Sequence, residues 1–173
     1  MGEYVKSNVV IMGASPVGYW TAKIAALLEF PLLVLDNKPE KLAPFADIPG
    51  VERRVVDFTA LPSFEELGIT DNSMVCVVTR GHQFDPQSFV YAMKSPAFYV
   101  GMLGRPAKNA KCVAYALDHG CTQEEIDRTC FPIGVKIGAI DAAEIGLSVV
   151  AQMVQAANAH TPREKDHESL HRA

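Results

Sequence analysis

The chain has 173 residues, which suits one domain, and its hydrophobic fraction of 49% is sufficient for a full core. Its formal net charge is −4, and Lys and Arg gather in no stretch, so nucleic acid is not an expected partner. Four scattered cysteines, no evident signal peptide and apolar runs of strand length predict a reduced, cytoplasmic protein without a membrane helix.

The N-terminal part has the pattern of a strand, a glycine turn, a helix and a second strand. Asn8–Met12 is an apolar, β-branched run that predicts a buried strand ending at Gly13. Val17–Leu28 has apolar residues at helical spacing, and Leu32–Leu35 predicts a second strand before Asp36. These elements together form a βαβ unit, whose right-handed crossover makes the two strands parallel.

Strands and helices continue to alternate along the rest of the chain. We expect strands over 54–56, 74–79 and 98–103, and helices over 85–93, 106–119 and from 141 onward. Asp85 before Pro86 is the predicted N-cap of the first of these helices. Capping boxes at 63–66 and 122–125 each predict the start of a short helix, and 38–49 is expected to be a loop with a short helix.

This alternation predicts an α/β fold: a Rossmann-like doubly wound, mainly parallel sheet with helices on both faces. We expect residues 1–159 to form a single nucleotide- or cofactor-binding domain and the polar residues 160–173 to be a disordered tail. Ligands of such sheets bind at the carboxyl ends of the strands, so the candidate site residues are those that follow a strand.

The first candidate site is the turn after the first strand. It has the pattern G-x-G-x-x-G, with a serine at the middle glycine, in Gly13, Ala14, Ser15, Pro16, Val17 and Gly18. Such a turn brings the backbone and the helix N-terminus to a phosphate. Ser15 adds a Cβ where the phosphate approaches, although its hydroxyl can donate, and Pro16 lacks an N–H. The alternative is a turn whose glycines serve packing alone.

Two further candidates follow the second and fourth strands. Asp36 stands where an acid accepts from ribose hydroxyls and repels a 2′-phosphate, which favours NAD over NADP, although Lys38 weakens this discrimination. Of Thr79, Arg80 and His82, the arginine can bind a phosphate and the histidine can donate to a ligand or move a proton. Asp85 either orients His82 or only caps its helix. Solvated turn residues are the alternative in both places.

Gly104 and Arg105, with Lys108 nearby, repeat the pattern of strand end, glycine and helix start, which is either a second anion site or a solvated basic helix start. Segment 132–139, with two glycines and a proline, is expected to have a structural role near the ligand edge, and Cys130 is the one cysteine considered as a ligand. The chain has no G-x-S-x-G elbow and no zinc-ligand spacing, so no catalytic residue and no metal ligand is predicted.

From Asn8 to about Ala157 the chain resembles the C-terminal Rossmann domain of the xanthine dehydrogenase accessory family (XdhC/CoxI). The matching segments are VVIMGASPVG, VLDNKPE, VVTRGHQFD, YVGMLG and, most specific, FPIGVKIGAIDAAEIGLSVVAQMV. The resemblance implies a chaperone-type accessory protein that holds molybdenum cofactor and delivers it to a molybdenum hydroxylase. It implies ligand contacts at Gly13 to Gly18, Asp36, Thr79, Arg80, His82 and Gly104.

Members of that family normally carry a separate N-terminal domain, and with only Met1–Ser7 before the first strand we expect this chain to act without one. The expectation is either a separate accessory chain as partner or a domain that has kept nucleotide binding alone. The ligand is NAD(P) or molybdenum cofactor (molybdopterin), since both carry phosphate. The leading function is accessory, without turnover. The alternatives are an NAD(P)-dependent oxidoreductase with His82 as proton donor, and a nucleotide-sensing regulatory domain. The last helix is apolar on a broad face, so it packs either on the sheet or on a second copy of the chain, and a homodimer is the preferred expectation.

Overall fold

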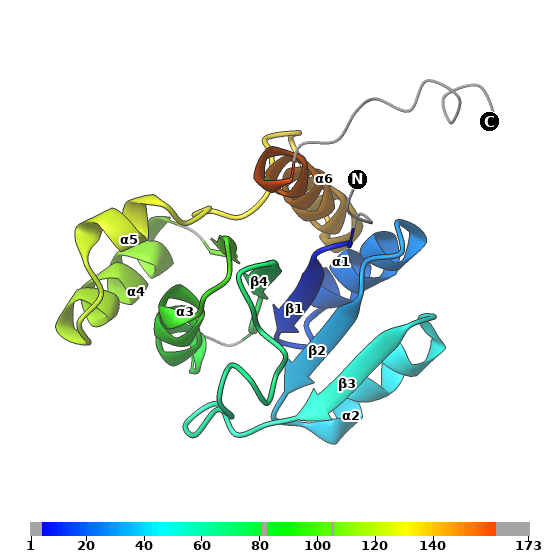
Figure 1. Ribbon diagram of the computed structural model, residues 1–173, viewed down its shortest axis with the longest axis horizontal. Coiled ribbons are helices and arrows are strands. Elements are labelled where there is room, and N and C mark those ends of the chain that lie inside the picture. The colour runs from blue at the N-terminus through cyan, green and yellow to red at the C-terminus, as the bar shows by residue number, and fades with distance from the viewer. Residues whose placement is uncertain (1–4, 81–82, 105, 162–173) are drawn as a thin grey trace.

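Five parallel strands form one sheet in the order β3-β2-β1-β4-β5 (Figure 1). The computed structural model describes residues 5–80, 83–104 and 106–161. The strands are β1 (Asn8–Met12), β2 (Leu32–Asp36), β3 (Val51–Val55), β4 (Ser73–Val77) and β5 (Tyr99–Met102). The chain builds outward from β1 to β3 and then crosses to the other side of β1 for β4. The predicted Rossmann-like fold is confirmed, and its topological switch point lies between β1 and β4.

Helices cover both faces of the sheet, as predicted (Figure 1). Helices α1 and α6 pack on one face, and α3 and α4 pack on the other. The helices are α1 (Pro16–Leu27), α2 (Pro39–Leu42), the 3-10 helix η1 (Ala43–Asp47), α3 (Asp85–Lys94), α4 (Pro106–Asp118), α5 (Gln123–Asp127) and α6 (Ala142–His160). No described helix has both the length and the apolar character needed to cross a bilayer.

Strand β1 shows why the central strands are apolar throughout. Val9 and Ile11 belong to the core under α1 and α6, whereas Val10 and Met12 belong to the core under α3 and α4. All four side chains are fully buried. Because helices cover both faces of this strand, none of its side chains faces solvent, and its sequence is a continuous hydrophobic run.

A glycine lets α6 lie directly on α1. A Cβ added at Gly146 would stand 2.7 Å from the Cβ of Trp20 and 2.9 Å from the backbone nitrogen of Thr21, closer than real Cβ contacts come. The buried face of α6 includes Val149 and Met153. This face of α6 is thus occupied by α1 of the same chain.

The two edges of the sheet differ. Strand β3 spans 51–55 rather than 54–56, and it carries exposed Glu52 and Arg53. Next to β5, Cys130 forms a single parallel bridge with Gly101: its N–H donates to the Val100 carbonyl at 2.8 Å, and its carbonyl accepts from the Met102 N–H at 3.0 Å. The segment after α5 therefore runs along β5 for one residue pair.

Two helix starts differ from prediction. The Ser63 N–H donates to the Glu66 carboxylate at 2.9 Å, and the Glu66 N–H donates back to the Ser63 hydroxyl at 3.3 Å, as in a capping box. No helix follows, because Gly68 takes a left-handed conformation (φ +64°) after a single turn. The matching box at Thr122 does begin α5.

The second difference is the start of α3, where Asp85 is not the N-cap. That position belongs to Phe84, which makes no side-chain capping bond. Asp85 is the first helical residue and is buried, and its carboxylate accepts a hydrogen bond from the Thr79 hydroxyl. The predicted tail from residue 160 lies outside the described residues except for His160, which ends α6, and Thr161.

Candidate functional site

The glycine turn is pressed against the end of β4. Gly13 has a φ of +111°, and a Cβ there would lie 2.5 Å from the Cα of Thr79. A Cβ on Gly18 would lie 2.4 Å from the Gly13 carbonyl oxygen. Both positions therefore require glycine, the first for the tight turn and the second for the close approach of α1 to β1.

Ser15 caps the helix that follows the turn. Its backbone is extended, and its Oγ accepts a hydrogen bond of 3.1 Å from the Gly18 N–H. Pro16 occupies the first helical position, where its missing N–H costs nothing. The Ser15 side chain is buried and lies over the helix N-terminus. The Ser15 side chain therefore accepts from one of the N–H groups that have no partner inside α1.

The N–H groups of the turn divide into bonded and open ones. The Gly13 N–H donates to the carbonyl of Leu35 at 2.8 Å, and the Ala14 N–H donates to Asp36 Oδ2 at 2.8 Å. Among the residues that the structure describes, the N–H groups of Ser15 and Val17 have no hydrogen-bond partner. Two donors at the positive end of a 12-residue helix remain for an anion.

Asp36 ties the end of β2 to this turn. Its Oδ2 accepts from the Ala14 N–H, its Oδ1 accepts from the Lys38 N–H at 3.0 Å, and the Lys41 ammonium stands 3.9 Å from Oδ1. Only 3% of the residue's surface is exposed. The carboxylate thus has a structural task already, and its expected contact with ribose hydroxyls stays a prediction.

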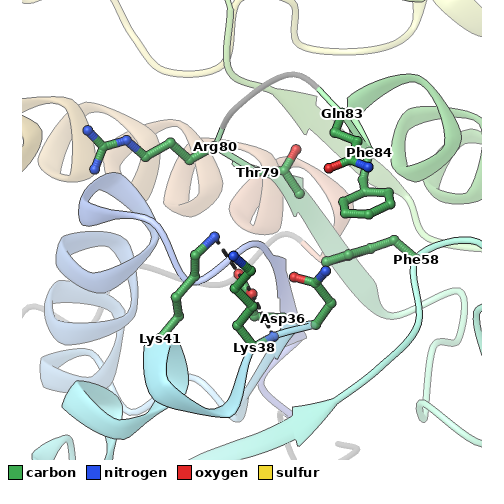
Figure 2. A pocket seen from close by; sticks show the side chains of 9 residues that line it. Asp36, Lys38, Lys41, Phe58, Thr79, Arg80, Gln83 and Phe84 are labelled. Atoms are coloured by element: carbon green, nitrogen blue, oxygen red, sulfur yellow. Dashed lines mark hydrogen bonds and ion pairs between the residues drawn. The ribbon is translucent and has the colours of Figure 1, made fainter.

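A hollow of about 130 Å³ opens at the carboxyl ends of β2 and β4 (Figure 2). We call it the strand-end hollow; its lining residues are Asp36, Asn37, Lys38, Lys41, Phe58, Thr79, Arg80, Gln83 and Phe84. Figure 2 shows the Lys38 and Lys41 ammonium groups pointing toward Thr79, whereas the Arg80 side chain extends away from Phe84. The hollow lies where ligands bind in this fold class.

One wall of the strand-end hollow is aromatic. The rings of Phe58 and Phe84 stack with their centroids 5.5 Å apart and an angle of 27° between their planes. Phe58 is buried and Phe84 is half-buried, so the second ring is partly open. Sequence reasoning missed both phenylalanines, because they stand in loops and no local pattern marks them.

The structure brings together only some of the predicted site residues. The turn, Asp36, Thr79 and Arg80 gather at one edge, where Thr79 is buried and Arg80 is exposed. Gly104 is half-buried after β5 and does not line the strand-end hollow. His82 and Arg105 lie outside the described residues, as does the Lys108 side chain.

Segment 132–139 has the structural role expected for it. The Gly134 N–H and the Tyr99 hydroxyl both donate to Oε1 of Gln152, each at 2.8 Å. A Cβ on Gly134 would lie 2.4 Å from the Ser148 hydroxyl, and Ile133 is buried against Gly101. Residues 133–134 of the segment therefore pack between β5 and α6, whereas residues 136–138 are exposed.

The cysteines are suited to packing rather than reaction. Burial raises the pKa of Cys76 to about 12, and burial also raises the pKa of the half-buried Cys130 thiol. A raised pKa leaves little of the reactive thiolate near neutral pH. Within the described ranges, no group of three His, Cys, Asp or Glu residues is placed to hold a metal ion.

Comparison with known proteins identifies relatives of this domain. The family model described as the XdhC Rossmann domain matches residues 9–153. "Uncharacterized protein YqeB" of Escherichia coli K12 is 28% identical over 89% of this chain and 28% of its own length. A probable xanthine dehydrogenase subunit of Bacillus subtilis 168 is 26% identical over 87% of this chain and 43% of its own length.

A solved structure shows the same fold. The crystal structure of a xanthine dehydrogenase from Bacillus halodurans matches with a TM-score of 0.73 and 23% identity, over 95% of this chain and 46% of that one. The chain thus spans less than half the length of each of these three relatives. The family match covers most of the chain, including the glycine turn, Asp36 and the 132–139 segment. The chain therefore belongs to the family of the XdhC Rossmann domain.

Proposed function

We propose that this domain is an accessory protein for the maturation of a molybdenum hydroxylase and that it binds a phosphate-bearing cofactor at the turn 13–18. Membership of the XdhC family and the similarity to a probable xanthine dehydrogenase subunit support the accessory role. The cofactor is molybdopterin, as cargo, or NAD(P). The domain holds the ligand, and turnover is no part of the proposal.

The open N–H groups of Ser15 and Val17 carry the proposal. They lie at the N-terminus of α1, where the helix dipole favours negative charge. The absence of a Cβ at Gly13 keeps the turn narrow, and the strand-end hollow lies beside it with cationic side chains in its lining. A phosphate at this edge meets backbone donors from one side and ammonium groups from the other.

Two substitutions at Ser15 test where the anion binds. Ser15→Asp and Ser15→Asn both keep an N-cap, because aspartate and asparagine are good capping residues. The aspartate alone places a negative charge at the proposed phosphate position. We expect calorimetric titration with NAD, NADP and molybdopterin cofactor to show a loss of about tenfold or more in Ser15→Asp and little change in Ser15→Asn.

Co-expression with a xanthine dehydrogenase-type hydroxylase tests the accessory role. The measured quantity is the molybdenum cofactor content of the purified hydroxylase. The wild-type chain is expected to raise it and Ser15→Asp to raise it less. Equal cofactor content with the wild type, with Ser15→Asp and without the chain would contradict the accessory role.

A further inference from the structure

The strand-end hollow has an imbalance of charge that its surroundings do not compensate. Three cationic side chains, Lys38, Lys41 and Arg80, line it with a single carboxylate, Asp36, in a chain of net charge −4. Among the residues described, no carboxylate lies within ion-pair distance of Lys38 or Arg80. Unpaired cations concentrated in a concave place attract an anion.

The one carboxylate in the lining does not repel such an anion effectively. Asp36 is 3% exposed, and each of its oxygens accepts a backbone N–H bond. The Lys41 ammonium lies 3.9 Å away, near the outer limit of an ion pair. Asp36 is therefore compensated by its own neighbours, Lys41 among them, while the Lys38 ammonium has no carboxylate partner among the described residues.

The two lysines approach the hollow from the same side. Lys38 is the N-cap residue of α2, with an extended backbone, and Lys41 lies three residues later, inside that helix. Figure 2 shows both ammonium groups directed toward Thr79. A phosphate monoester carries close to two negative charges at neutral pH, whereas each phosphate of a diester carries one. Two ammonium groups match the monoester.

We propose that the strand-end hollow binds a phosphate monoester of the ligand between Lys38 and Lys41, with a planar ring of the ligand against Phe84. This rests on the proposed binding of a phosphate-bearing cofactor at the adjoining turn. The group has two sources, the 2′-phosphate of NADP and the terminal phosphate of molybdopterin. NAD has no phosphate monoester, because its two phosphates form a pyrophosphate bridge with one negative charge each, and it is the weaker ligand.

The test compares ligands that differ by the monoester alone. Calorimetric titration of the full chain with NADP and NAD, and with 2′-AMP and adenosine, is expected to favour the phosphorylated member of each pair by about tenfold. If molybdopterin is the source, the pterin cofactor binds while NADP does not. Two results together would overturn the proposal. The first is equal affinity for NADP and NAD and for 2′-AMP and adenosine, and the second is that Lys38→Gln leaves the affinity for the pterin cofactor unchanged.

A substitution of Lys38 and a matched control test where the phosphate monoester binds. Lys38→Gln is expected to weaken NADP or the pterin cofactor about tenfold and to leave NAD unchanged. Lys111→Gln, at an exposed position of α4, makes the same change of net charge and is expected to change none of them. Equal weakening by Lys38→Gln and Lys111→Gln would overturn the lysine assignment, because it would show only a long-range charge effect.

The outcomes separate this inference from the proposed function. One outcome is that NAD and NADP bind with equal affinity, that Ser15→Asp weakens both and that Lys38→Gln weakens neither. This outcome would support phosphate binding at the turn and overturn the monoester site. Absence of binding by every probe would overturn both. Discrimination for the monoester that is lost in Lys38→Gln supports both proposals.

Discussion

The backbone N–H of Ala14 donates a 2.8 Å hydrogen bond to the Oδ2 atom of Asp36, which joins the glycine turn after β1 to the end of β2. This hydrogen bond gives the acidic residue at the end of β2 a structural role that does not depend on a bound ligand. Its buried carboxylate holds the turn in the shape that leaves the N–H groups of Ser15 and Val17 without a partner among the described residues.

Asp36→Ala is expected to lower the free energy of unfolding by about 2 to 4 kcal/mol, because it leaves the N–H groups of Ala14 and Lys38 without their acceptor. Urea denaturation measures the change. Asp47→Ala removes an exposed carboxylate and is expected to cost almost nothing. Equal effects of the two substitutions would contradict a structural role for Asp36.

Gly146→Ala tests the contact of α6 with α1. The added methyl group meets the Trp20 side chain and the Thr21 backbone, so we expect a net destabilisation of about 1 to 3 kcal/mol in thermal or urea unfolding. Ala normally stabilises a helix interior by about 1 kcal/mol over Gly. Ala151→Gly, at an exposed site of the same helix, measures that propensity alone. A more stable Gly146→Ala variant would show that the helices are not in close contact.

Gln152→Leu is expected to destabilise the protein by about 2 to 4 kcal/mol. The buried Tyr99 loses the acceptor of its hydroxyl, and the half-buried Gly134 N–H loses the same oxygen. The control, Gln155→Leu, makes the same chemical change at an exposed position of α6. Denaturant midpoints of the two variants should differ clearly; coinciding midpoints would count against the shared acceptor.

Arg80→Ala is expected to weaken phosphate-bearing ligands about tenfold with little change in stability, since Arg80 is exposed and lines the strand-end hollow. Titration calorimetry and thermal unfolding of the same samples give both quantities. Arg53→Ala removes an exposed arginine from β3, away from the hollow, and should leave binding intact. Unchanged affinity in Arg80→Ala would remove Arg80 from the site.

Alkaline pH should reveal the burial of Cys76. Burial raises its thiol pKa from an ordinary value of 9.0 to about 12, with a smaller contribution from Cys130. The unfolded chain then ionises first, so the thiol's contribution to stability is full below pH 9 and is lost as the pH rises toward 12. Urea denaturation of the wild type and Cys76→Ala across this range is expected to show a smaller pH slope in the variant. Identical slopes would contradict the raised pKa.

Local patterns predicted the fold well. The βαβ unit, the glycine turn and the capping box at Thr122 each involve residues close together in the chain, so their spacing alone carries the information. The equivalent box at Ser63 shows the limit of this reasoning. Its side chains make the expected bonds, and the glycine that ends the turn then prevents a helix.

The rest depended on contacts between distant parts of the chain. Gly146 meets Trp20, and Gln152 gathers Tyr99 and Gly134, across separations that no local pattern encodes. The strand-end hollow likewise takes Phe84 from the start of α3 and Lys41 from α2. Sequence reasoning placed Asp36 at this edge; only the tertiary structure showed that its carboxylate faces the turn.

The two edge strands of the sheet limit how other proteins can bind to this domain. An unpaired strand edge is a ready template on which another chain can add a strand, and charged side chains are a common defence against it. At one edge, β3 carries the charged residues Glu52 and Arg53. At the other edge, Cys130 pairs with Gly101 of β5. Both features disfavour the addition of a strand. If the domain hands its ligand to a hydroxylase, as proposed, that partner is expected to contact helices and loops rather than to add a strand to the sheet.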